Sequence, residues 1–270
     1  MPPMLKSLRT LFGPRQSGPA PAIPAGQRVY AVGDVHGRLD LFDVLIAAIE
    51  ADDAARGRAD TTIVLLGDLV DRGPDSAGVI RTARALQLRR TVRILLGNHE
   101  EMFLDALESE EVLRHFLRYG GRETALSYPI EPAAYHRAEL DEALGLIRAA
   151  VPREDIDFIR TFEDQVRIGD YLFVHAGVRP GVPLEEQRVE DLRWIREPFL
   201  SHRESLGPLV VHGHTIFERV DFADNRIGID TGAYRTGRLT ALGLEGTKRW
   251  LIEAVEDEKG VLSATQRSAA

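Results

Sequence analysis

Short blocks of acidic, histidine and glycine residues recur along this 270-residue chain in a fixed order. They are Gly33–Gly37 (GDVHG), Gly67–Gly73 (GDLVDRG), Gly97–Glu100 (GNHE), His175–Gly177 (HAG) and Gly213–Thr215 (GHT). Carboxylate, imidazole and carboxamide groups are ligand types that hold manganese, iron or zinc. Because a pair of such ions is a standard arrangement for in-line attack at phosphorus, the blocks predict a two-metal phosphoesterase site.

The first two blocks offer ligands for a first ion. Asp34 and His36 are two residues apart, so both side chains can point the same way from an extended strand end. We expect Asp68 to bridge to a second ion, and a bridging carboxylate holds two divalent ions about 3.5–4 Å apart. This spacing leaves room for a bridging hydroxide, whose pKa the two ions lower. The remaining expected ligands of the second ion are Asn98, His175 and His214.

Another set of side chains is expected to act on the phosphate itself. His99 directly follows Asn98, and we predict that it is the general acid that protonates the leaving oxygen. Asp71 is expected to bind one ring nitrogen of His99, which fixes the tautomer and raises the pKa of the imidazole. Arg72 supplies a planar fork for two phosphate oxygens.

Buried strands and amphipathic helices alternate around the first three blocks. Each block follows a short run of strand-forming residues and precedes apolar residues at helical spacing. Three blocks therefore lie at the carboxyl ends of three successive strands, where open α/β sheets place their ligands. The predicted strands are 28–32, 62–66 and 92–96, and the predicted helices are 39–49, 76–87 (with Ser76 as its N-cap) and one from about 101.

The middle of the chain has a different pattern. Residues 102–162 are mainly helical in pattern and are predicted to form an insertion or cap over the site, either recognising substrate or only packing. After the insertion, short strand-like runs with turn signals suggest a second sheet packed on the first. These later strands are expected at 171–174, 209–211, 226–229, 239–244 and 249–254.

Composition excludes several classes of function. The chain has no cysteine, which removes disulfide frameworks, thiolate metal sites and phosphatase mechanisms with a cysteine nucleophile. A formal net charge of -8 argues against a nucleic-acid partner, because binding phosphate backbones needs clustered positive charge. No apolar run approaches the roughly 20 residues of a transmembrane segment, and no signal-peptide core is present, so a cytoplasmic location is expected.

The two ends of the chain are predicted to lie outside the catalytic unit. Residues 1–26 contain basic residues but no acidic ones, and 13–26 is rich in proline, glycine and alanine, which predicts a flexible tail and linker. Residues 257–270 are expected to form a C-terminal tail. The catalytic domain is therefore expected to span 27–256, with the helical insertion within it.

The blocks together resemble the metallophosphoesterase superfamily and, more closely, the bacterial PPP-type serine/threonine protein phosphatases. The similarity runs from Val29 to Leu244, and its most specific element is Gly67–Gly73. The resemblance implies an α/β four-layer fold, with two mixed β-sheets sandwiched between helices. It also implies two divalent metal ions, with manganese expected and iron or zinc as alternatives. Ile216 stands where many broader superfamily members have a further histidine, which favours the protein-phosphatase branch.

The same resemblance implies roles for individual residues. It places Asp34, His36 and Asp68 on the first ion, and it gives His99 the role of proton donor. It also adds Arg196 as a weaker match to a second phosphate-binding arginine. The other matching positions are Asp68, Asn98, His175 and His214 on the second ion, Asp71 as the partner of His99, and Arg72 as a phosphate-binding arginine.

Three functions stay open at this stage. The first is hydrolysis of phosphomonoesters, with phosphoserine or phosphothreonine in proteins as substrate and small phosphoesters also accepted. The second is hydrolysis of a dinucleoside tetraphosphate, because symmetrical diadenosine tetraphosphatases also resemble the chain from Gly33 to Glu100. The third is an inactive phosphate-binding scaffold, against which the complete ligand set counts, since unpaired acids around an empty site repel one another.

The cap and the segment 193–197 should distinguish the first two functions. A nucleotide substrate needs an aromatic or apolar slot for its base and more positive charge for its longer phosphate chain. The cap aromatics that could form such a slot, or could merely pack, are Phe116, Tyr119, Tyr128 and Tyr135.

Overall fold

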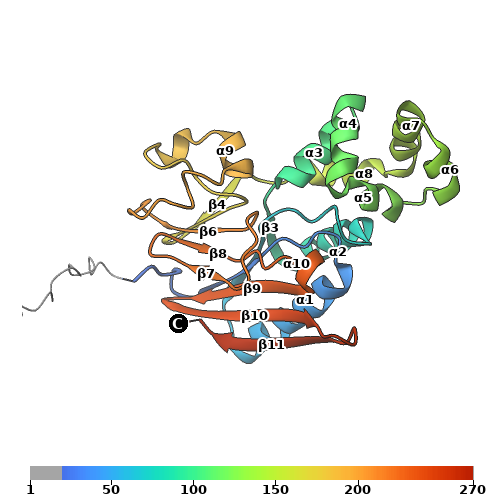
Figure 1. Ribbon diagram of the computed structural model, residues 1–270. Helices are drawn as coiled ribbons and strands as arrows, with labels where there is room; N and C mark the ends of the chain where they lie inside the picture. Colours follow the sequence, from blue (N-terminus) through green and yellow to red (C-terminus); the bar gives the residue numbers. More distant parts are fainter. Residues whose placement is uncertain (1–19, 270) are drawn as a thin grey trace, which may run out of the picture.

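Two β-sheets lie against each other in the computed structural model, which describes residues 20–269 (Figure 1). The first sheet has the strand order β11-β10-β9-β1-β2-β3, and the second has the order β4-β5-β6-β8-β7. In the first sheet, β1 pairs in parallel with β2 and antiparallel with β9, so the sheet is mixed. Its strands are β1 (Gln27–Val32), β2 (Asp60–Leu65), β3 (Thr91–Ile94), β9 (Arg238–Glu245), β10 (Lys248–Glu256) and β11 (Leu262–Ser268).

Strand β1 shows why the first sheet is buried on both sides. Tyr30 and Val32 pack into the core formed with the helices, whereas Val29 and Ala31 pack into the core between the two sheets. Because side chains along a strand alternate between faces, an unbroken apolar strand fills both cores.

The second sheet carries the remaining layer on its outer face. Leu172 and Val210 of this sheet pack there with Leu192 of helix α9 (Val189–Trp194). Helices, sheet, sheet and α9 thus form the four layers that the family resemblance implies, and this expectation is confirmed. The strands of the second sheet are β4 (Gln165–Ile168), β5 (Tyr171–Val174), β6 (Leu209–His212), β7 (Asp221–Phe222) and β8 (Arg226–Gly228).

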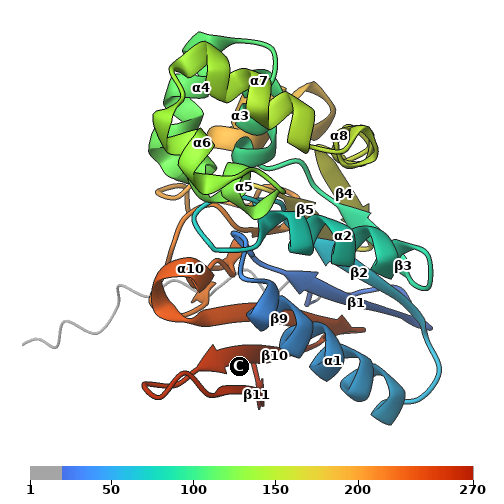
Figure 2. The same ribbon diagram turned by 90° about the vertical axis from the view of Figure 1, so that its right-hand side faces the viewer.

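Helices cover the other face of the first sheet and build the insertion. Helices α1 (Leu39–Ala55) and α2 (Ser76–Gln87) lie along this sheet, and the insertion helices gather above it (Figure 2). The N-cap of α2 is Asp75, whose carboxylate accepts the Gly78 N–H at 2.7 Å, so the predicted Ser76 cap is wrong by one residue. None of the described helices is long and apolar enough to cross a lipid bilayer.

The insertion is almost entirely helical, as its pattern predicts. A one-turn π-helix with a kink joins its second and third helices. Two further short helical turns lie outside it, η2 (Leu184–Glu186) and α10 (Ala233–Thr236). The elements of the insertion are α3 (Asn98–Ala106), α4 (Glu110–Phe116), the π-turn η1 (Leu117–Gly121), α5 (Arg122–Ser127), α6 (Pro132–Arg137), α7 (Leu140–Ala150) and α8 (Arg153–Ile159).

The chain ends differ from the expected tails. Strand β11 occupies much of 257–270 and pairs antiparallel with β10 along its whole length. Asp257 caps the intervening turn, since its Oδ1 accepts the backbone N–H groups of Lys259 and Val261, both at 2.8 Å. At the other end, Ile23 is buried and its N–H binds Gly246 O at 2.9 Å. The rest of the predicted N-terminal tail, 1–19, lies outside the described residues.

Candidate metal centre and active site

The predicted site residues follow the carboxyl ends of five strands. Asp34 and His36 come directly after β1, and Asp68 follows β2. Strands β1, β2 and β3 are parallel to one another, as are β5 and β6. Carboxyl ends of parallel strands meet at one edge of a sheet, which brings the loops together. The residues contributed after the other three strands are Asn98 and His99, His175, and His214.

Two groups of potential metal ligands meet at Asp68. In each group the ligand atoms lie within 4.8 Å of one another; one consists of His36, Asp68 and His99, and the other of Asp68, His175 and His214. Asn98 joins the second group, because its Oδ1 lies 3.0 Å from His175 Nε2 and 2.8 Å from His214 Nδ1. Asp68 is common to both groups, which is the position that a bridging carboxylate needs.

Asp34 lies beside the backbone of His214, a member of the second group. It belongs to neither group found among residues 20–269, and its carboxylate accepts the backbone N–H of His214 at 2.9 Å. The expectation assumed an extended strand end, in which Asp34 and His36 point the same way. His36 instead has a left-handed backbone with φ of 46°, so the chain is not extended at that residue.

Left-handed backbone conformations concentrate at the site. Such conformations are strained for residues with a Cβ and persist only where the surroundings enforce them. Functional sites are where such strain typically gathers. The non-glycine residues with positive φ in the described chain are His36, Asp68, Asp71, Arg72 and His214.

Glu100 is the residue that enforces part of this geometry. Its buried carboxylate accepts backbone N–H groups from Asp68 at 2.8 Å, Leu69 at 2.7 Å, Val70 at 3.2 Å and Gly97 at 3.0 Å. The loop after β2 is thereby tied to the start of α3. Glu100 ends the GNHE block directly after His99, but the block alone does not predict this role for it.

The donor set faces inward with lone pairs, which fits metal binding. His36 and His175 each direct Nδ1 at a backbone carbonyl, at 2.9 and 2.8 Å, so Nδ1 carries the hydrogen and Nε2 carries the lone pair. Burial lowers the pKa of both rings and keeps them neutral. His175 Nε2 nevertheless lies 3.0 Å from Asn98 Oδ1 and 3.4 Å from Asp68 Oδ1. Facing acceptors of this kind are stabilised by a cation between them.

Buried acidic groups are a second reason to expect cations at this site. Burial raises the pKa of Asp34, assisted by the charges of Asp230 and Asp68. Burial also raises the pKa of Asp230 to about 6 and that of Glu100 to about 7. Burial is the main cause of each shift and the charge of Asp68 adds to it, and divalent cations would offset both effects.

The predicted acid and its partner are in direct contact. His99 Nδ1 lies 2.6 Å from Asp71 Oδ2, and both side chains are buried. Burial acts to lower the pKa of His99, but the Asp68 charge and the Asp71 hydrogen bond outweigh it and raise the pKa. Arg72 directs its fork at two rings, with Nη1 2.6 Å from His36 Nε2 and Nη2 2.8 Å from His99 Nε2.

Arg196 is the predicted residue that the structure leaves at the edge. It is exposed, and its side chain forms no hydrogen bond or ion pair within residues 20–269. Its charge still reaches the site, because it is one of the causes, after burial, that lower the pKa of His175 and His214. The neighbouring Arg193 is held away, with Nη1 2.6 Å from Glu101 Oε1 and Nη2 2.6 Å from Asp164 Oδ1.

Most of the cap aromatics are packed away. Phe116 and Tyr128 are buried in the core that the insertion shares with the first sheet, and Tyr135 packs against the same core. Tyr119 is 48 % exposed and contacts the His115 ring at 4.4 Å between centroids. Tyr234 of α10 provides another aromatic ring at the site itself. The Arg72 guanidinium lies over this ring, with Arg72 Cζ 4.8 Å from the ring centroid.

The fold and the site agree with a known class of hydrolases. The sequence pattern of the calcineurin-like phosphoesterases matches residues 27–235, and this chain belongs to that family. It is therefore a metallophosphoesterase, an enzyme of a family that uses divalent metals to hydrolyse phosphoric esters.

Two curated relatives carry different substrate names. The chain is 30% identical over 220 residues to serine/threonine-protein phosphatase 1 of Salmonella typhimurium, an alignment covering 79% of this chain and 90% of that protein. It is 33% identical over 162 residues to a symmetrical bis(5'-nucleosyl)-tetraphosphatase of an Acidovorax species. That second alignment covers 58% of this chain and 47% of the relative, so the chain spans about half the length of that protein.

A solved structure supports the fold independently. The cold-active protein-tyrosine phosphatase of a Shewanella species superimposes with a TM-score of 0.54, covering 90% of this chain and 83% of that one. The two sequences are 20% identical, so the likeness concerns the fold alone.

Proposed function

We propose that this metallophosphoesterase hydrolyses phosphomonoesters and acts on phosphoserine or phosphothreonine in proteins. The observation that carries the proposal is the small amount of free positive charge around the site. Arg72 points into the site and Arg196 stands unpaired at its edge among the described residues, whereas Arg193 is neutralised by two carboxylates. Two arginines suit one phosphoryl group better than a chain of four phosphates.

We assign the ligands as the sequence predicts. Asp34, His36 and Asp68 would hold one ion, with manganese expected and iron or zinc as alternatives. Asp34 stays in this set because it is buried beside the His214 backbone and close enough for the Asp68 charge to raise its pKa. The second ion would be held by Asp68, Asn98, His175 and His214.

The residues around the ions would then divide the work on phosphate. Bound divalent ions supply Lewis acidity and activate the attacking water. Arg72 would bind two phosphate oxygens through its fork, since both of its terminal nitrogens point into the site. His99 would give a proton from Nε2 to the leaving oxygen, and Asp71 would hold Nδ1 and stabilise the imidazolium. Arg196 would contribute to phosphate binding from the edge.

A dinucleoside tetraphosphate is the second candidate substrate, and one aromatic side chain favours it. Tyr119 is exposed in the π-turn that contacts Arg72, where a base could stack beside a bound phosphate. The relative from Acidovorax is named for this activity. The burial of Phe116 and Tyr128 counts against a larger base pocket in the cap.

Side-by-side turnover tests the choice of substrate. We would measure phosphate release by the manganese-loaded protein from a phosphothreonine peptide and nucleotide products from diadenosine tetraphosphate, with Asp68→Ala as the inactive control. A higher kcat/KM for the peptide supports the proposal, and a higher value for the dinucleotide replaces it with the second candidate. No turnover of either substrate by protein that retains both ions would favour a phosphate-binding scaffold.

A further inference from the structure

The helical insertion reaches the catalytic turn through two contacts. The backbone N–H of Arg72 binds Gly120 O at 3.0 Å, and Gly120 has a φ of 111°. A Cβ at Gly120 would lie 2.6 Å from Arg72 Cγ, so only glycine allows this approach. The second contact is made by Thr124 of α5, whose side chain is fully buried against Asp71. The insertion is therefore part of the wall of the active site.

The hydrogen bonds of the Thr124 hydroxyl can be assigned individually. Thr124 Oγ1 accepts the Asp71 backbone N–H at 2.8 Å and donates to Asp71 Oδ1 at 2.6 Å. Ser76 Oγ lies 2.9 Å from the same oxygen and must donate to it, because the only hydroxyl hydrogen of Thr124 is already used. Thr124 thus binds both the main chain and the carboxylate of one residue.

This arrangement holds the Asp71 carboxylate in a single orientation. Its Oδ2 binds His99 Nδ1 and its Oδ1 binds Thr124, and the residue has no exposed surface. Asp71 also has a left-handed backbone with φ of 74°, which the bond between its N–H and Thr124 helps to hold. Resting on the proposed function, we infer that Thr124 is a positioning residue for the general acid: it fixes the Asp71 carboxylate, which in turn orients the His99 ring.

Removing the hydroxyl has a predictable chemical effect. In Thr124→Val, Asp71 Oδ1 becomes a buried carboxylate oxygen without its donor, and such an oxygen is costly to leave unpaired. The Asp71 backbone N–H keeps Ser76 Oγ as a partner at 3.0 Å, so the main chain is partly supported. The defect therefore falls on the Asp71–His99 pair and on proton transfer. Proton transfer matters most when the leaving group is a poor one.

Leaving-group dependence separates this role from a structural one. The manganese-loaded protein is assayed with a phosphothreonine peptide, which has a poor leaving group, and with 4-nitrophenyl phosphate, which has a good one. For Thr124→Val we expect kcat on the peptide to fall roughly 10–100-fold, and on 4-nitrophenyl phosphate less than about threefold. Thr124→Ser restores the donor and should keep both values within about threefold of the parent. Thr124→Ala repeats the hydroxyl deletion with a smaller side chain.

Ser127 provides the matched control on the same helix. Its Oγ accepts the Ala77 N–H at 3.1 Å and donates to Thr124 O at 2.7 Å, without touching Asp71 or His99. Ser127→Ala should lower the melting temperature and leave the ratio of the two kcat values unchanged.

The outcomes distinguish this inference from the proposed function. His99→Ala is measured with the same two substrates. If His99→Ala shows strong leaving-group dependence and neither Thr124→Val nor Thr124→Ala does, the positioning role is wrong and the acid assignment stands. If His99→Ala lowers kcat by the same factor on both substrates, the assignment of His99 as general acid is itself wrong. Equal losses on both substrates in the Thr124 variants, or no rescue by serine, would also overturn the inference.

Discussion

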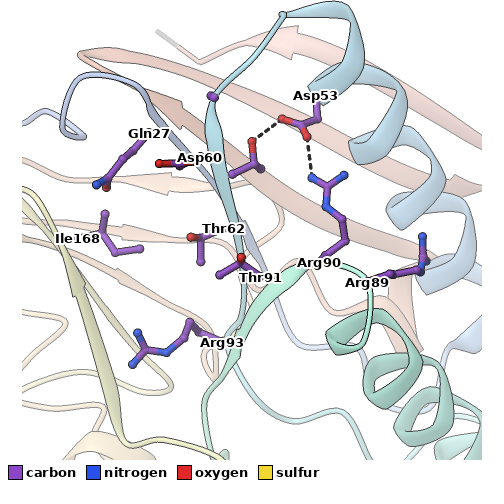
Figure 3. Close-up of a pocket in the computed structure, with 11 residues that line it drawn as sticks. Gln27, Asp53, Asp60, Thr62, Arg89, Arg90, Thr91, Arg93 and Ile168 are labelled. Atoms are coloured by element: carbon purple, nitrogen blue, oxygen red, sulfur yellow. Dashed lines mark hydrogen bonds and ion pairs between the residues drawn. The ribbon is translucent and has the colours of Figure 1, made fainter.

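The two ends of the parallel strands β1, β2 and β3 hold their charged residues in opposite ways. Near their amino ends lies a cavity of about 530 Å³, whose lining includes Arg89, Arg90 and Arg93 (Figure 3). Each arginine has a carboxylate partner; Arg90 Nη2, for example, lies 2.6 Å from Asp53 Oδ2. At the carboxyl ends, acceptors face one another and His214 Nε2 is buried with no hydrogen-bond partner among the described residues.

This difference shows which charged cluster is structural. Paired charges with ordinary hydrogen bonds stabilise a fold without needing a ligand. Facing acceptors, raised carboxyl pKa values and left-handed backbone all cost stability, and such costs are typical of sites built to bind something else. Substitutions at the carboxyl ends should therefore change metal content and turnover, whereas those at the amino ends should change stability alone.

The largest effect is expected at the residue shared by both ligand groups. Asp68→Ala removes a carboxylate from each group, and losing the ions removes several kcal/mol of transition-state stabilisation. We expect kcat/KM on the phosphothreonine peptide to fall by about 10³-fold or more, with metal retained after dialysis well below that of the parent. Elemental analysis and circular dichroism of the same samples check this. Full metal content with parental activity would place the metal centre elsewhere.

His99→Ala should separate metal binding from proton transfer. The ring binds Asp71 and Arg72, and His99 is not among the ligands proposed for either ion, so the ions should stay bound. Turnover of the phosphothreonine peptide is expected to fall by about 10²–10⁴-fold. Metal content and kcat are measured on one preparation. If the metal is lost together with activity, His99 is itself a metal ligand. Its position close to His36 and Asp68 would be consistent with that role.

The sequence predicted the parts of this site that depend on local order. Strand, loop and helix follow one another in Val29–Glu100, so the blocks had to meet at the carboxyl ends of the strands. Thr124 could not be found in this way, because it lies 53 residues from Asp71 and stands in no recognisable motif. The left-handed backbone of His36 could not be foreseen either, because the local pattern predicts an extended strand end there. The exposed strand β11 was missed because it has no alternating apolar pattern.

A stability effect without a kinetic one is expected at the amino ends. Asp53 accepts Arg28 Nη1 at 2.7 Å and Arg90 Nη2 at 2.6 Å, and Arg28 is almost completely buried. Asp53→Ala leaves Arg28 with Glu245 as its remaining ion-pair partner among the described residues. We expect the free energy of unfolding to fall by about 2–3 kcal/mol, with kcat unchanged. Chemical denaturation and peptide turnover give the two values.

Asp60 is the matched control for that change. It lines the same cavity but is exposed and forms no ion pair within residues 20–269. Asp60→Ala should alter the free energy of unfolding by less than about 0.5 kcal/mol. Equal effects of the two variants, or a large loss of turnover in Asp53→Ala, would break the division between a structural end and a functional end.

The smallest expected effect is the pH dependence of the stability that the Asp53 carboxylate contributes. Burial acts to raise the pKa of Asp53, but hydrogen bonds from Thr61, Arg28 and Arg90 outweigh it and hold the pKa below its ordinary value. The ionised carboxylate therefore stabilises the folded state at pH above its unfolded-state pKa of about 4, and this contribution is lost as pH falls through the lower folded-state value. The difference in melting temperature between the parent and Asp53→Asn should be constant from about pH 7 to 5 and shrink below about pH 4. A difference that stayed constant or grew on acidification would show that the carboxylate is not held by these donors.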